Sequence, residues 1–116
     1  MARGFDIAAS PRLKAEIWVG AYLRRCTSAG AFAALSRRGD ASAGAIFIEV
    51  IHDKGCDLWA PAPLAAHRAF ECVLQDVDPL AVTERLENEQ KFDPDLWIVT
   101  LEDRAGRAFL EDDERG

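Results

Sequence analysis

A histidine and a cysteine, His52 and Cys56, flank a hairpin turn that the sequence predicts at the centre of the chain. A cysteine becomes a nucleophile when an imidazole accepts its proton and a third group orients the ring, a role that Asp53 or Asp57 could take. However, a hairpin tip has no wall to exclude water, and a single histidine beside a turn is usually structural. The pair is therefore a candidate polar site, and the sequence assigns no catalytic residue.

Four arginines form two adjacent pairs, Arg24 with Arg25 and Arg37 with Arg38. Guanidinium groups bind phosphate through paired hydrogen bonds, so these side chains are candidates for an anion or partner contact. The first pair ends a predicted helix, where the dipole favours cations. The second pair follows a predicted strand, and a rise of ~3.3 Å per residue separates the two pairs by roughly 20 Å. A single phosphate site built from all four arginines is not expected.

Acidic residues bracket the predicted strand around Trp97, with Asp93 and Asp95 before it and Glu102 and Asp103 after it. Paired carboxylates can hold a divalent cation or transfer protons. The strand separates the two groups by roughly 20 Å, and aspartate beside proline is ordinary turn chemistry. Two histidines and no Cys-x-x-Cys pair predict no metal site and no cofactor.

The three cysteines, Cys26, Cys56 and Cys72, are widely spaced and odd in number, which does not indicate a disulfide framework. We expect each to be a small buried apolar residue. The apolar runs are far shorter than the ~20 residues of a membrane-spanning helix, and the first residues lack the apolar region of a secretory signal. These features predict a cytoplasmic protein without a membrane partner.

The net charge of −6 is unevenly distributed along the 116 residues. Residues 1–40 carry seven Lys/Arg against three Asp/Glu, a balance of +4, and the remainder carries seven against seventeen, a balance of −10. This pattern predicts an acidic face and a basic end. It argues against general nucleic-acid binding, which normally uses a net basic domain, and leaves weak binding by the basic N-terminal third as an alternative.

The strongest structural signal is a β-hairpin, with strands over residues 44–51 and 56–60 and a turn that ends at Gly55. The first strand is largely apolar on both faces, so both faces need cover. Either the first helix or a second chain could cover the face that carries Phe47.

The first predicted helix begins at Ser10-Pro11, where serine favours the N-cap and proline the first helical position. It presents two apolar strips, one of which contains Leu13 and Ile17. Further elements are expected: strands over 31–37, 96–101 and 107–110, and helices over 64–76 and 78–91.

Strands that are segregated from helices and joined by tight turns predict an α+β fold. We expect an antiparallel sheet of four to five strands with about three helices, in the order α-β-β-β-α-α-β(-β). Residues 1–10 are expected to form a flexible arm, 11–110 a single domain and 111–116 a disordered acidic tail.

Three segments carry a resemblance to a known family: residues 13–26 (LKAEIWVGAYLRRC), 37–45 (RRGD, then AGA) and 92–97 (FDPDLW). Over roughly residues 12–110 the chain resembles a family of short, uncharacterised alphaproteobacterial proteins of the domain-of-unknown-function class. The resemblance implies a compact bacterial domain. It implies no activity and carries over no site residue.

The sequence therefore assigns no definite function, and the absence of a catalytic set argues against an enzyme. The two-faced helix, the two-faced strand and the opposed charges favour a domain that acts through protein contacts, as a homodimer or as an accessory subunit. The alternative is an enzyme that binds a small ligand or a phosphoester with the arginines and Asp or His52.

Overall fold

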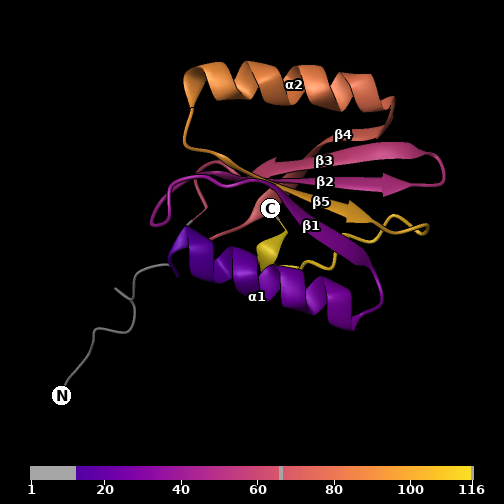
Figure 1. Ribbon diagram of the computed structural model, residues 1–116, viewed down its shortest axis with the longest axis horizontal. Helices are drawn as coiled ribbons and strands as arrows, with labels where there is room; N and C mark the ends of the chain where they lie inside the picture. Colours follow the sequence, from indigo (N-terminus) through magenta and orange to yellow (C-terminus); the bar gives the residue numbers. More distant parts are fainter. Residues whose placement is uncertain (1–12, 66, 116) are drawn as a thin grey trace.

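A mixed β-sheet lies between two helices in the computed structural model, which describes residues 13–65 and 67–115 (Figure 1). In this part of the chain the sheet has five strands, in the order β1-β5-β2-β3-β4. Neither helix is long and apolar enough to cross a membrane. The elements in chain order are α1 (Ala15–Ser28), β1 (Phe32–Arg37), β2 (Ile46–His52), β3 (Gly55–Pro61), β4 (Phe70–Val77), α2 (Pro79–Phe92), β5 (Trp97–Glu102) and the 3-10 helix η2 (Asp112–Glu114).

Strand β5 makes the sheet mixed, because it pairs antiparallel with β1 and parallel with β2. The other pairs, β2 with β3 and β3 with β4, are antiparallel. Helix α2 leads the chain from β4 back across the sheet, and β5 then inserts between β1 and β2. The α+β class is confirmed and the purely antiparallel sheet is wrong, since a parallel pair needs a long crossover whose landing place local patterns do not fix.

The predicted helix over 64–76 is wrong, because most of this segment forms strand β4. The described residues therefore contain two α-helices rather than three. Short apolar runs fit helical and strand periods alike. Pairing with β3 supplies this segment with backbone hydrogen bonds along a register that shifts twice. Cys72 is consequently exposed on an edge strand, contrary to the expected burial, whereas Cys26 and Cys56 are buried.

The helix, strand and tail predicted at the two ends of the chain also differ from the structure. Helix α1 begins at Ala15 with Lys14 at the N-cap position, and Ser10-Pro11 and the N-terminal arm lie outside the described residues. Residues 107–110 form no strand. Instead of a disordered tail, residues 112–114 form η2, because Glu114 is buried against partners on α1.

One face of the sheet is covered by α1 and the C-terminal segment (Figure 1). The buried side of the helix is the broad face that the sequence predicts. Its opposite strip, with Leu13 and Ile17, remains more than half exposed. The buried residues of α1 are Ala15, Trp18, Val19, Tyr22 and Cys26.

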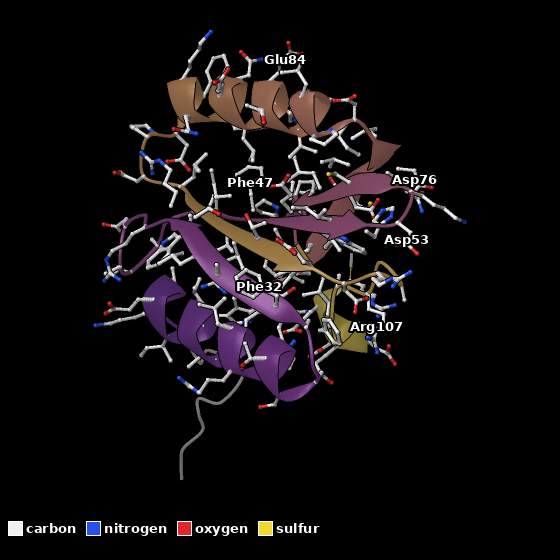
Figure 2. All side chains as sticks on the ribbon, turned by 45° about the vertical axis from the view of Figure 1, so that its right-hand side comes forward. Phe32, Phe47, Asp53, Asp76, Glu84 and Arg107 are labelled. Carbon is white, nitrogen blue, oxygen red and sulfur yellow. The ribbon has the colours of Figure 1, made fainter. Side chains whose placement is uncertain are left out.

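Helix α2 covers part of the other face, including Phe47 of β2. Phe47 packs in one cluster with Val82 and Leu86 of α2, and Figure 2 shows its ring between the helix and the sheet. The cover therefore comes from the same chain. Leu80, in the first turn of the same helix, is exposed.

Candidate functional site

The carboxyl ends of β2, β4 and β5 lie at the same edge of the sheet, the edge formed by strand ends and not by an outer strand, because these three strands run in the same direction. His52 ends β2, Asp76 precedes the last residue of β4 and Glu102 ends β5. In open sheets, ligands bind outside the carboxyl ends of parallel strands. Two shallow cavities of about 340 and 400 Å³ open at this edge.

His52, Asp57 and Asp76 converge at this edge from three strands. The Nε2 atom of His52 lies 2.9 Å from Oδ1 of Asp57 and 3.2 Å from Oδ1 of Asp76. The backbone N–H of Asp76 also donates to Asp57 Oδ1, at 2.9 Å. The side chains of His52 and Asp57 are only 6% and 11% exposed, whereas that of Asp76 is 49% exposed.

The protonation of His52 follows from its other ring nitrogen. Nδ1 accepts the backbone N–H of Lys54 at 3.1 Å, so it carries no proton and Nε2 holds one. Nε2–H then donates to the carboxylate of Asp57, and Oδ1 of Asp76 lies 3.2 Å from the same nitrogen. In this state the imidazole has no free lone pair, so it cannot act as a general base.

The proposed pairing of His52 with Cys56 does not form. In the hairpin register Gly55 pairs with His52, and Cys56 pairs with Ile51 on the opposite face of the sheet. Cys56 is buried in the cluster under α2, and burial and nearby carboxylates raise the pKa of its thiol. Asp57, one of the two expected orienting groups, is the partner of His52.

The two arginine pairs lie at opposite ends of α1 and are largely engaged with the protein itself. Arg25 pairs with Glu114 at 2.7 Å, and Arg38 pairs with Glu16 at 2.8 Å. Arg37 donates to the backbone carbonyls of residues 94 and 96, and Arg24 is exposed. They form no common anion site.

The segments that carry the family resemblance pack against one another. The indole Nε1–H of Trp97 donates to the carbonyl of Asp40, and the Asp40 amide donates to the carbonyl of Asp95. A Cβ on Gly39 or Gly44 would lie 2.2 or 2.4 Å from that same Asp95 oxygen. The packing of these segments therefore requires an indole at position 97 and no side chain at positions 39 and 44.

The acidic residues around β5 do not form one centre. Asp93 accepts the Asp95 amide in a turn, and Asp103 is buried and bound by Arg107. The hydrogen bonds from Arg107 hold the pKa of the Asp103 carboxyl below its usual range. The carboxylate that the sequence missed is Asp76, which it assigned to a helix.

A second surface lies on the face of the sheet that α2 partly covers. Among the described residues, α2 contacts mainly β3 and β4, and the part of this face formed by β1, β5 and the end of β2 remains exposed. Phe32, Glu102 and Ile51 occupy one row across β1, β5 and β2, so their side chains share a face. Phe32 is 64% and Ile51 37% exposed, and Figure 2 shows Phe32 on β1, well away from α2. We call this surface the open face; it comprises Phe32, Ala34, Ser36, Glu49, Ile51, Thr100 and Glu102.

The fold and these surfaces define a small α+β domain, and comparison with known proteins gives its family. The chain belongs to the family described as protein of unknown function, DUF1491, whose profile matches residues 13–111. No curated protein matches the chain. The family resemblance seen in the sequence is thereby confirmed.

Solved structures of alphaproteobacterial proteins are similar to this chain over most of its length. A crystal structure of a DUF1491 family protein from Caulobacter crescentus CB15 has 33% identity and a TM-score of 0.79, and the match covers 90% of this chain and 97% of that one. The solution structure of protein Atu0922 from A. tumefaciens has 39% identity and a TM-score of 0.75, and the match covers 80% and 87%.

Proposed function

We propose that this protein is a cytoplasmic interaction domain that binds a protein partner through the open face. The observation that carries the proposal is the exposure of Phe32 and Ile51 on a sheet face that is otherwise covered by a helix. Glu102 lies between these two side chains in the row, and a surface that combines exposed apolar side chains with charged groups is typical of non-obligate protein interfaces.

The unpaired edge of β1 supports the same conclusion. Protein edges are usually protected by lysine, proline or bulges. The opposite edge strand, β4, has two register shifts and a positive φ at Asp76. Strand β1 also has a register shift between Leu35 and Arg37, but Phe32 to Leu35 pair regularly with β5 and contain no charge, so a partner strand can extend the sheet along these residues.

The chemistry of the open face selects a partner with apolar and cationic side chains. Glu49 lies on β2, at the side of this surface next to β3, where it is half-buried and accepts a hydrogen bond from Thr100 at 3.4 Å. Burial raises the pKa of its carboxyl. A lysine or arginine of the partner would compensate the Glu49 and Glu102 charges, while apolar side chains cover Phe32 and Ile51.

The arrangement of the arginines favours protein contacts over phosphoester chemistry. Arg25, Arg37 and Arg38 are occupied by carboxylates and carbonyls of the chain itself. Such groups would have to be released before they could bind a phosphate, and the same holds for a nucleic-acid backbone.

A photo-crosslinking amino acid at position 34 tests the proposal, with position 84 as the matched control because Glu84 points away from the sheet on α2 (Figure 2). Position 34 should give a discrete crosslinked species in native cells, and Phe32→Ser should abolish it without changing the unfolding midpoint. Sedimentation velocity of the pure protein tells whether the partner is a second copy or another protein. A strict monomer without crosslinks specific to position 34 contradicts the proposal.

A further inference from the structure

We propose that His52, Asp57 and Asp76 bind a divalent transition-metal ion of the Zn²⁺ class. Their donor atoms all lie within 4.8 Å of one another. A tetrahedral site with bonds of about 2.0–2.2 Å separates neighbouring donors by roughly 3.3–3.5 Å. The observed separations of 2.9 and 3.2 Å from His52 Nε2 need to widen by a few tenths of an ångström, and the exposed Asp76 carboxylate can adjust its distance to Asp57, which is at most 4.8 Å.

The donor set and its surroundings select this class of ion. One imidazole with two carboxylates suits Zn²⁺ or a neighbouring transition metal, whereas Mg²⁺ and Ca²⁺ prefer oxygen ligands alone. Among the described residues, no Lys or Arg lies within 4.0 Å of the Asp57 or Asp76 carboxylate. A dication would therefore meet two carboxylates that form no direct ion pair with a Lys or Arg of the described residues.

The geometry also provides an entrance and a position for a further ligand. His52 and Asp57 are almost fully enclosed, so they are fixed, whereas Asp76 reaches solvent. Figure 2 places Asp76 at the outer end of the strands, close to Asp53. The cavity of about 340 Å³ beside them, which Lys54 and Arg104 also line, has room for water or an anion as the fourth ligand.

Metal binding requires one proton to move. In the metal-free protein Nε2 of His52 is protonated, because Nδ1 accepts the Lys54 amide. Coordination through Nε2 transfers that proton to Nδ1, so no net proton is released, and the Lys54 N–H turns to solvent. Lys54 is exposed in the hairpin turn, where this movement disturbs little else. Loss of protection at the Lys54 amide is therefore a specific signature of metal at this site.

Isothermal titration of the chelator-treated full chain with ZnCl₂ and MgCl₂ tests the inference, in a Cys72→Ser background that removes the exposed thiol. We expect one Zn²⁺ per chain and no measurable Mg²⁺ binding. Asp76→Asn should weaken Zn²⁺ binding at least tenfold, whereas Asp53→Asn, a matched change on the cavity rim, should leave it within about twofold.

Amide hydrogen exchange should show faster exchange at Lys54 when Zn²⁺ is bound. Asp57→Asn removes a buried ligand and should also abolish Zn²⁺ binding. If the Asp57→Asn variant does not fold, the result for the exposed Asp76→Asn decides the test. Absence of binding at millimolar Zn²⁺, or undiminished binding by Asp76→Asn, overturns the inference. Neither result bears on the open face, which lies on the other side of the sheet from Asp57.

Discussion

Replacement of Glu114 by alanine should be among the more damaging single changes near the C-terminus. The Glu114 carboxylate accepts the guanidinium of Arg25 at 2.7 Å and the indole N–H of Trp18 at 3.1 Å. Its side chain is only 12% exposed. These contacts fasten residues 108–115 to α1 across the face of the sheet that the segment helps to cover.

The magnitude follows from the hydrogen bonds that Glu114 accepts, which include one from the Glu111 amide at 2.8 Å, and from the state of the groups left behind. Hydrogen bonds to a charged group contribute about 1.5–3 kcal/mol each. Arg25 remains partly solvated and keeps its bond to the Phe109 carbonyl at 2.8 Å, which lowers the cost. We expect Glu114→Ala to lower the free energy of unfolding by about 2–3 kcal/mol, measured by urea denaturation at pH 7.

Asp112→Ala is the matched control, because this acidic residue lies in the same short helix but is exposed. It should change the free energy of unfolding by less than about 0.5 kcal/mol. An equally small effect of Glu114→Ala would refute the reasoning and would mean that the C-terminal segment contributes little to stability.

The same carboxylate gives a pH dependence with a definite sign. Burial raises the pKa of Glu114, but the Arg25 guanidinium outweighs it and holds this pKa below its usual range. A lowered pKa in the folded state stabilises the protein above the unfolded value of about 4.3, and this stability is lost as the pH falls through the folded pKa. The difference between wild type and Glu114→Ala should therefore shrink below about pH 4.3; a constant difference down to pH 3 would contradict it.

Three further predictions concern the core and the open face, all measured by urea denaturation at pH 7. Gly39→Ala should destabilise by about 2 kcal/mol or more, because its Cβ meets a backbone carbonyl oxygen at 2.2 Å, whereas Gly20→Ala within α1 should stabilise by about 0.5–1 kcal/mol. Leu86→Ala, under α2, should cost about 2–5 kcal/mol, and the exposed Leu80→Ala far less. Glu49→Gln should stabilise by no more than about 0.5 kcal/mol, because the raised pKa shows that the half-exposed carboxylate is penalised when ionised.

Local patterns accounted for the elements whose signals lie within a few residues. The hairpin around Gly55 forms with the positive φ that the turn needs. Asp78 caps α2 and Pro79 opens it, at the start of the helix predicted over 78–91. The buried face of α1 and the strand around Trp97 also follow from periodicity, because one face of each must meet the core.

Partner choice between distant strands was not encoded locally. β4 has an apolar arc that fits a helix, and only the free edge of β3 decides that it becomes a strand. The insertion of β5 beside β2 likewise depends on where α2 crosses the sheet. Because the segment of β4 was predicted as a helix, Asp76 was not expected near the end of a strand. The three residues could therefore not be grouped from the sequence.

Two of the three residues of the cluster, in contrast, could be placed together from the sequence. A two-residue turn at 53–54 pairs His52 with Gly55 and therefore pairs Ile51 with Cys56. Side chains alternate along a strand, so Cys56 must face away from His52, and Asp57 must share its face. The hairpin register alone replaces a cysteine–histidine dyad by a histidine–carboxylate pair. What had to come from the structure is the third group, Asp76 on β4, which turns that hydrogen-bonded pair into the proposed metal site.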